Sequence, residues 1–196
     1  YPKLRAQILA DVDSRVLPVP AAQAAGVTTL NEAMGKALLA DHGVTVPACV
    51  TGTVEEVTNA ADGLGYPLAV KLLNADLAHK NIAGAVHLDI KNASGLKHAI
   101  TTIQASVTRY NAHLDTTHFL IEAMVTAPRA EFIVGVSHKP GVGHALVIGR
   151  GGTDVEELKD FTTLLLPTSS AQIQQALQSL RITRRLQLQE TDVAAL

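Results

Sequence analysis

Apolar residues along the chain follow two spacings, one helical and one typical of strands. They recur every three or four positions over 94–110, which predicts an amphipathic helix. The almost wholly apolar run 68–73 predicts a buried strand, and the alternation over 86–90 predicts a half-buried one. A further short strand is expected near 48–51. Beyond it the expected elements are strands at 118–124, 130–137, 145–148 and 161–166, and a last helix around 173–180.

Helix starts are marked by two Thr-x-x-Glu patterns. Thr29 with Glu32 and Thr53 with Glu56 each predict a capping box, in which the threonine and the glutamate satisfy the first free N–H groups of a helix. Gly43 is expected to end the first of these helices. The second is expected to end within 63–65.

The order of elements predicts a mixed α/β (α+β) chain of two lobes. We expect an N-terminal helix and linker over 1–27, a first lobe over 28–117 and a strand-rich second lobe over 118–196. Residues 182–196 keep an apolar pattern and stop without a helix cap. The sequence therefore predicts that the chain stops inside a domain.

Composition narrows the function classes. Of 196 residues 47% are apolar, and 16 Lys and Arg face 18 Asp and Glu, so the net charge is −2. This balance disfavours a nucleic-acid binder that neutralises phosphates. The single cysteine, Cys49, cannot form an internal disulfide, and no run approaches eighteen apolar residues. We expect a cytoplasmic protein that does not span a membrane.

Several well-known binding motifs are absent from the sequence. It holds no Gly-x-Gly-x-x-Gly, no phosphate-binding P-loop, no His-Glu-x-x-His and no paired cysteines. A dinucleotide-binding dehydrogenase, a P-loop enzyme and a zinc protease are therefore disfavoured, and no metal ligands are assigned.

Three features could carry chemistry. Lys71 is a cation inside an apolar strand, where a buried charge is unfavourable. Either its ammonium group pairs with an anion, such as a phosphate or carboxylate of a ligand, or its flexible side chain carries the ammonium group to solvent. The loop 74–85 contains His79, Lys80 and Gly84, and could cover a polyphosphate or be a plain surface turn. A neutral imidazole is nucleophilic near pH 7, so His79 could accept a phosphoryl group.

Acidic and glycine-rich positions give weaker signals. Glu122 and Glu131 lie at strand ends, where they could accept hydrogen bonds from a ligand or simply keep a sheet edge soluble. The run 149–152 offers backbone N–H groups and room for a ligand, or is a bend after a strand.

Taken together, these segments resemble one family. The runs that carry the resemblance are Gly65-Tyr66-Pro67-Leu68-Ala69-Val70-Lys71, Asn74-Ala75-Asp76-Leu77-Ala78-His79-Lys80, Gly84-Ala85-Val86, Glu131-Phe132-Ile133-Val134-Gly135-Val136, Gly149-Arg150-Gly151-Gly152 and Val155-Glu156-Glu157-Leu158-Lys159-Asp160. They are similar to the ATP-grasp domain of NDP-forming acyl-CoA synthetases, such as ADP-forming acetate–CoA ligase and the succinyl-CoA synthetase beta chain. The resemblance covers about residues 28–180 in order.

The resemblance implies a fold and a reaction. It implies a two-lobed ATP-grasp fold that is truncated at its C-terminus. Acyl-CoA, ADP and phosphate would be interconverted with carboxylate, CoA and ATP through a phosphohistidine. The implied partners are CoA-binding domains or a subunit of the same synthetase.

The resemblance also implies residue roles. Lys71 would bind nucleotide phosphates with Lys80 and Gly84. His79 would be the second phosphohistidine, after a histidine of the CoA-binding part that first takes up the phosphoryl group. The strand end Glu122-Ala123-Met124 would form the hinge that meets the adenine, and Glu131 would hold the ribose hydroxyls. Mg²⁺ would accompany the nucleotide, but the family's metal ligands lie in segments beyond the end of this chain. We therefore expect this chain to be inactive alone.

Departures from the family pattern leave alternatives open. The family's Gly-Gly-Val reads Gly84-Ala85-Val86, and its polar residues after His-Lys read Asn81-Ile82. The added methyl of Ala85 is expected to limit approach to a phosphate, and Arg150 makes the second glycine run more polar. The same domain could be a non-catalytic sensor in a protein lysine acetyltransferase. An ATP-grasp lobe with an unrelated carboxylate substrate is disfavoured by the His79-Lys80 loop.

Overall fold

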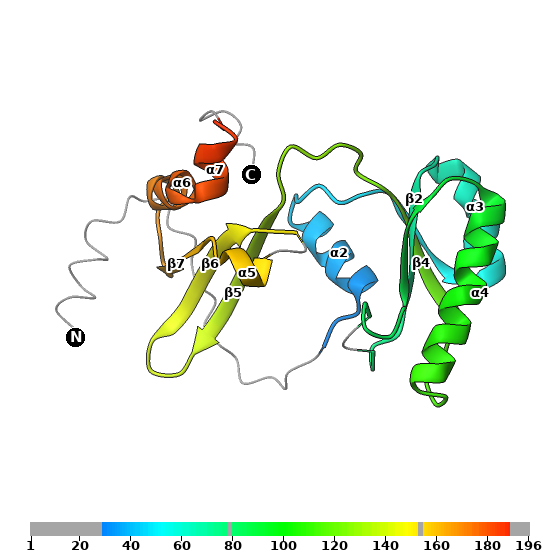
Figure 1. Ribbon diagram of the computed structural model, residues 1–196. Helices are drawn as coiled ribbons and strands as arrows, with labels where there is room; N and C mark the ends of the chain where they lie inside the picture. The colour runs from blue at the N-terminus through cyan, green and yellow to red at the C-terminus, as the bar shows by residue number, and fades with distance from the viewer. Residues whose placement is uncertain (1–28, 78–79, 153–154, 189–196) are drawn as a thin grey trace. The chain divides into compact units, whose positions relative to one another are not determined.

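The computed structural model describes residues 29–77, 80–152 and 155–188 (Figure 1). The helix and linker expected over 1–27 lie outside these residues. The chain divides into two compact units, an N-terminal unit that ends at Thr126 and a C-terminal unit from Ala127 onward.

The N-terminal unit is built on a four-stranded antiparallel sheet with the order β1-β4-β2-β3. Its strands are β1 (Cys49–Thr53), β2 (Leu68–Leu72), β3 (Val86–Ile90) and β4 (His118–Ala123). The sequence predicts a lobe boundary between 117 and 118, whereas the first unit runs on to Thr126. The physical reason is that β4 pairs with both β1 and β2, so it lies inside this sheet.

Helices α3 (Val54–Leu64) and α4 (Ala93–Tyr110) cover one face of this sheet (Figure 1). The predicted capping box at the start of α3 is confirmed, with Thr53 and Glu56 each bonded to the backbone of the other. The core between helices and sheet is mainly aliphatic, and α4 contributes to it the face that the spacing over 94–110 predicts. Its members include Val57, Ala61, Leu68, Val70, Leu72, Leu96, Ile100, Ile103, Val107, Phe119 and Ile121.

Helix α2 (Glu32–Asp41) lies on the opposite side of the sheet from α3 and α4 (Figure 1). The capping box predicted for Thr29 and Glu32 is wrong. Asn31 is the N-cap, and its side chain accepts a hydrogen bond from the Met34 N–H at 2.9 Å. Asparagine is one of the residues that N-cap positions favour. Because Glu32 is not part of a capping box, its carboxylate is free to contact other groups. Gly43 follows the helix end with φ +81°, as expected for a helix stop.

The C-terminal unit is a three-stranded antiparallel sheet, β5-β6-β7, covered by short helices. Its elements are β5 (Phe132–Lys139), β6 (Gly143–Arg150), α5 (Val155–Leu158), β7 (Phe161–Leu165), α6 (Ser170–Ser179) and α7 (Arg181–Arg185). A turn over 140–142 joins β5 to β6. Ile148 packs against Leu177, Leu180 and Ile182 to form the core of this unit.

Two polar contacts organise the end of this unit. The carboxylate of Asp160 accepts hydrogen bonds from the Arg181 and Ile182 N–H groups at 2.9 and 2.8 Å. Burial alone would raise the pKa of Asp160, but these two N–H donors outweigh it and lower the pKa. Asp160 thus ties the start of α7 to the strand edge.

Among the described residues, no helix is long and apolar enough to cross a membrane.

Candidate functional site

Lys71 projects from the face of β2 that is turned away from α3 and α4. Side chains alternate along a strand, so with Val70 and Leu72 in the core, Lys71 must point to the other side. There its Nζ lies 2.6 Å from Glu32 Oε1 and 2.5 Å from Glu122 Oε1. Lys71 is only half-buried, and the chain itself supplies two anions to pair with its charge.

Glu122 is the most buried charged group of the site, with 7% of the residue exposed. Its carboxylate forms ion pairs with both Lys36 and Lys71. The residues directly opposite Glu122 on β1 and β2 are Cys49 and Ala69. Because both are small, the long lysine side chains have room to reach the carboxylate from either side.

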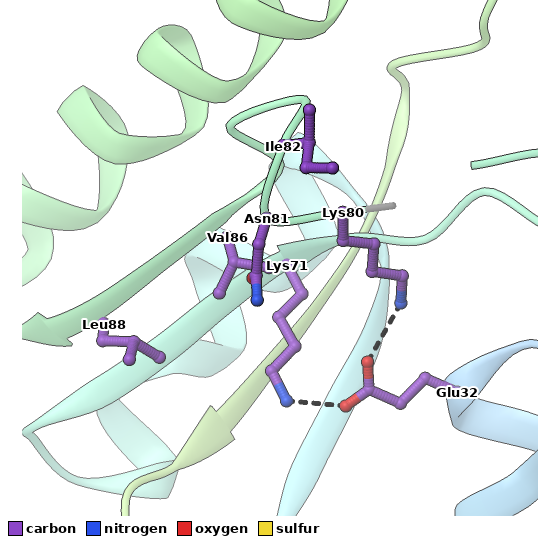
Figure 2. Close-up of a pocket in the computed structure, with 7 residues that line it drawn as sticks. All are labelled: Glu32, Lys71, Lys80, Asn81, Ile82, Val86 and Leu88. Carbon is purple, nitrogen blue, oxygen red and sulfur yellow. Dashed lines mark hydrogen bonds and ion pairs between the residues drawn. The ribbon is translucent and has the colours of Figure 1, made fainter. Parts of the chain in front are cut away.

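Glu32 links the helix α2 to the lysines of the sheet and the loop. Its Oε1 faces Lys71, and its Oε2 lies 3.0 Å from Lys80 Nζ (Figure 2). Lys36, one turn further along α2, lies 3.5 Å from Glu32 Oε1. We call Glu32, Lys36, Lys71, Lys80 and Glu122 the lysine–glutamate cluster.

The charges of this cluster shift one another's protonation. Burial raises the pKa of Glu32, but the hydrogen bonds and charges of Lys71 and Lys80 outweigh burial and bring the pKa down from 4.5 to about 2. For Lys36, burial and then the nearby charge of Lys71 lower the pKa. Glu32 is therefore ionised at every physiological pH.

Part of this cluster forms one side of an open pocket of about 650 Å³. The pocket is lined by Glu32, Lys71, Lys80, Asn81, Ile82, Val86 and Leu88 (Figure 2). It thus combines two ammonium groups with the apolar side chains of β3. Such a combination suits a ligand with both an anionic and an apolar part.

The loop from Lys80 to Ala85 contributes Lys80, Asn81 and Ile82 to the lining of the pocket, and it is tightly folded. The Ala85 N–H donates to the Lys80 carbonyl at 2.8 Å, and the Gly84 N–H donates to the Asn81 carbonyl at 3.2 Å. Gly84 has φ +65°, and a side chain built there would approach Ser106 at 3.1 Å. Both the positive φ and the close approach to Ser106 favour glycine at this position.

Ala85 does not behave as its departure from the family pattern suggests. It is fully buried and belongs to the core beneath the loop. Its methyl group therefore packs inward, and the expectation that it limits approach to a phosphate is wrong. Ile82, in contrast, is 75% exposed. His79, expected to be catalytic, lies outside the described residues.

Of the predicted hinge residues, Glu122 and Ala123 end β4, and Met124 follows the strand. The Ala123 N–H donates to the Ala48 carbonyl and the Met124 N–H to the Pro67 carbonyl, both at 3.0 Å. The sulfur of Met124 accepts a hydrogen bond from the Asp89 N–H at 2.9 Å. The N–H groups of Ala123 and Met124 thus already have partners within the chain.

Glu131 belongs to the C-terminal unit, where it is exposed just before β5. Its carbonyl accepts a hydrogen bond from the Gly151 N–H at 2.7 Å. A Cβ at Gly151 would approach Glu131 at 3.1 Å, and one at Gly149 would approach the Phe161 Cβ at 2.7 Å. Close packing of the strands is therefore sufficient reason for both glycines.

The structure thus brings together Lys71, Lys80 and Glu122 of the residues predicted from sequence. It adds Glu32 and Lys36, which sequence reasoning missed. The signal that could have found them is their spacing of four residues, which places both on the same side of a helix. In the described part of the chain, no three His, Cys, Asp or Glu residues are grouped so that they could hold a metal ion.

Comparisons with known proteins find a family match and relatives that cover most of the chain. Residues 21–196 match the family described as ATP-grasp domain. The chain is 35% identical to subunit beta of ADP-forming acetate–CoA ligase II from Pyrococcus furiosus over 145 residues, or 74% of this chain and 61% of that protein. It is 31% identical to ADP-forming 4-hydroxybutyrate–CoA ligase from Nitrosopumilus maritimus over 159 residues, or 81% of this chain and 23% of that protein.

A solved structure has a similar fold. The crystal structure of PH1788 from Pyrococcus horikoshii Ot3 matches with a TM-score of 0.73 and 28% identity, and the match covers 92% of this chain and 71% of that one. The chain spans about six-tenths of the acetate–CoA ligase subunit and about a quarter of the 4-hydroxybutyrate ligase.

Proposed function

Because the chain belongs to the ATP-grasp family, we propose that it binds the nucleotide of an ADP-forming acid–CoA ligase. The whole protein would interconvert acyl-CoA, ADP and phosphate with carboxylate, CoA and ATP. The observation that carries the proposal is the pairing of Lys71 with Lys80 at one pocket, in a chain whose relatives are ADP-forming CoA ligases.

The two lysines supply what phosphate binding requires. Phosphoryl transfer depends on neutralising charge and aligning oxygens more than on covalent chemistry from the protein. Lys71 and Lys80 place two ammonium groups at one wall of the pocket, and each is held by the same carboxylate. A nucleoside diphosphate offers phosphate oxygens that can replace this carboxylate at the Nζ atoms of Lys71 and Lys80.

The apolar side of the pocket suits the base of the nucleotide. Val86 and Leu88 provide an apolar surface on β3, and Met124 is joined to the next residue of that strand, Asp89. Since the N–H groups of Ala123 and Met124 are already bonded, the base would contact the carbonyl groups or the following residue of this hinge. Glu131 would bind the ribose hydroxyls.

His79 is proposed as the phosphoryl carrier. Its imidazole would be the second carrier: it would attack the phosphorus of a phosphohistidine that the CoA-binding part forms from acyl-phosphate, displacing that imidazole, and would later pass the phosphoryl group to ADP. CoA-binding domains or a subunit of the same synthetase would supply the acyl-phosphate. Mg²⁺ is expected with the nucleotide, but the described residues contain no cluster of three His, Cys, Asp or Glu side chains that could hold a metal ion, so no step is assigned to it.

The ligase is favoured over the acetyltransferase sensor, because the relatives named above are CoA ligases. The test is an assay of the full-length protein with ATP, CoA and a panel of short-chain acids, with ADP release measured. We expect ADP release only when both CoA and one of the acids are present, and its loss in Lys71→Ala. Binding of nucleotide without any acid-dependent ADP release would overturn the ligase and favour a sensor.

A further inference from the structure

We infer that Glu32 is a resident counter-ion of the phosphate site, which nucleotide phosphates must displace, and that it thereby sets the nucleotide affinity. The inference rests on the proposed nucleotide binding. It assigns a role to a residue of α2 that the sequence pattern presents only as half of a capping box and that none of the runs resembling the family includes.

The geometry of the Glu32 carboxylate is that of a bridging anion. One oxygen lies 2.6 Å from Lys71 Nζ and the other lies 3.0 Å from Lys80 Nζ. Two oxygens of one phosphate group would engage the same two ammonium groups in the same way. Glu32 and a phosphate therefore compete for the same hydrogen-bond donors.

The charge of the cluster indicates that Glu32 competes with a bound phosphate and does not help to bind it. Three lysines face two glutamates, so the cluster carries one net positive charge while Glu32 remains in place. A nucleotide diphosphate brings several negative charges, and Glu32 would repel them at contact distance. If Glu32 moves away, Lys80 loses the carboxylate that it contacts, and Lys71 keeps its pair with Glu122.

Helix α2 offers little resistance to such a movement. It contains no fully buried residue, and Met34, Leu38 and Leu39 are each about half exposed, at 51%, 49% and 48%. Apolar burial, which normally fixes a helix on a sheet, is therefore weak here. The ion pairs of Glu32 and Lys36 are the strong contacts that join α2 to the sheet and the loop.

A positioning role for Glu32 predicts the opposite sign. If Glu32 served only to orient Lys71 and Lys80 for the ligand, removing its charge would weaken nucleotide binding. If it is the competing anion, removing the charge strengthens binding. The direction of the change in affinity therefore separates the two roles.

The experiment is calorimetric titration of the full-length protein and its Glu32→Gln variant with ADP, AMP and adenosine. Glutamine keeps the size and hydrogen-bonding oxygen of the side chain, and thermal unfolding checks that the variant is folded. We expect ADP to bind about tenfold more tightly to E32Q, since about 1.4 kcal/mol corresponds to a factor of ten. AMP should gain less, and adenosine, which has no phosphate, should gain nothing.

The matched control is Glu55→Gln, which removes an exposed carboxylate from the first turn of α3 in the same unit. It should leave all three affinities unchanged. An unchanged or weaker affinity of E32Q for ADP overturns the role of Glu32 while the proposed function stands. If neither the natural protein nor E32Q binds ADP, the proposed function fails as well.

Discussion

Lys71 and Glu122 are diagonal neighbours on one face of the sheet, with Lys71 Nζ 2.5 Å from Glu122 Oε1. Glu122 is directly opposite Ala69 on β2, and Lys71 lies two residues further along that strand. Diagonal pairs across antiparallel strands are within reach of long side chains. The register of β2 and β4 therefore fixes this ion pair, and it does so before any ligand arrives.

Replacing Lys71 by methionine should weaken nucleotide binding. Methionine keeps most of the apolar stem but removes the ammonium group, and a hydrogen bond to a charged group contributes about 1.5–3 kcal/mol. We expect at least about a tenfold rise in the dissociation constant for ADP by calorimetry. The control is Lys97→Met on the exposed side of α4, which should bind ADP normally. Unaltered affinity in K71M would refute the assignment of Lys71.

Replacing Glu122 by glutamine should destabilise the fold itself. The change leaves Lys36 and Lys71 beside a neutral group at a site with little solvent. Breaking a buried ion pair from one side costs about 3 kcal/mol. Urea unfolding at pH 7 measures this loss, and Glu55→Gln should cost less than about 0.5 kcal/mol. Equal stability of the two variants would contradict the buried role of Glu122.

The pKa of Glu32 makes a prediction about acid stability. Because the pKa falls from 4.5 to about 2 on folding, ionised Glu32 stabilises the protein above pH 4.5. That contribution is lost as the pH falls toward 2. A quarter of the Glu32 side chain is exposed, so solvent weakens the effect. We expect the free energy of unfolding of the natural protein to be about 2 kcal/mol higher than that of E32Q at pH 7. Unfolding curves at pH 7, 4.5 and 3 should show this gap closing; a constant gap would argue against the ion pairs.

The corrected N-cap of α2 can be tested with two neighbouring substitutions. Asn31→Ala removes the side-chain acceptor of the Met34 N–H, whereas Thr29→Ala removes no cap contact. Loss of a cap costs about 1 kcal/mol, which corresponds to a roughly fivefold faster opening of the first turn. Hydrogen exchange at the Met34 amide should speed up in N31A and stay unchanged in T29A. The reverse pattern would restore the box of Thr29 and Glu32.

The phosphoryl carrier can be identified chemically. The full-length protein incubated with Mg-ATP should acquire an acid-labile phosphate, because a phosphorylated imidazole hydrolyses readily in acid. His79→Asn should abolish this label, while His87→Asn on β3 should retain it. Labelling that persists in H79N would remove His79 from the reaction.

Most of the fold could be predicted from the sequence, because the periodic pattern is strong where a core forms. The aliphatic residues of α4 and the apolar run of β2 face a continuous core, so pattern and structure agree. The lobe boundary near 118 was harder, since a strand's pairing partners depend on residues far away in the chain. The pattern of β4 marks it as a strand and says nothing of which sheet it joins.

The candidate site was only partly predictable for a related reason. Lys71 stands out because a cation interrupts an apolar strand, and that anomaly is visible locally. Glu32 is inconspicuous, since a glutamate in the first turn of a helix is ordinary and its lysine partners lie 39 and 48 residues away. The Thr29 pattern also explains the same glutamate locally, as part of a capping box. Only the side-chain contacts show that Asn31 is the cap and that Glu32 binds Lys71 and Lys80.

The loop 80–85 has two parts with different roles. Ala85 is buried and anchors the loop to the core, whereas Asn81 and Ile82 face the pocket. A change at the buried end alters how firmly the loop is fixed to the core. A change at Asn81 or Ile82 alters what a ligand meets, because both line the pocket. Ligand preference can therefore be re-engineered at these two positions with the anchor left intact.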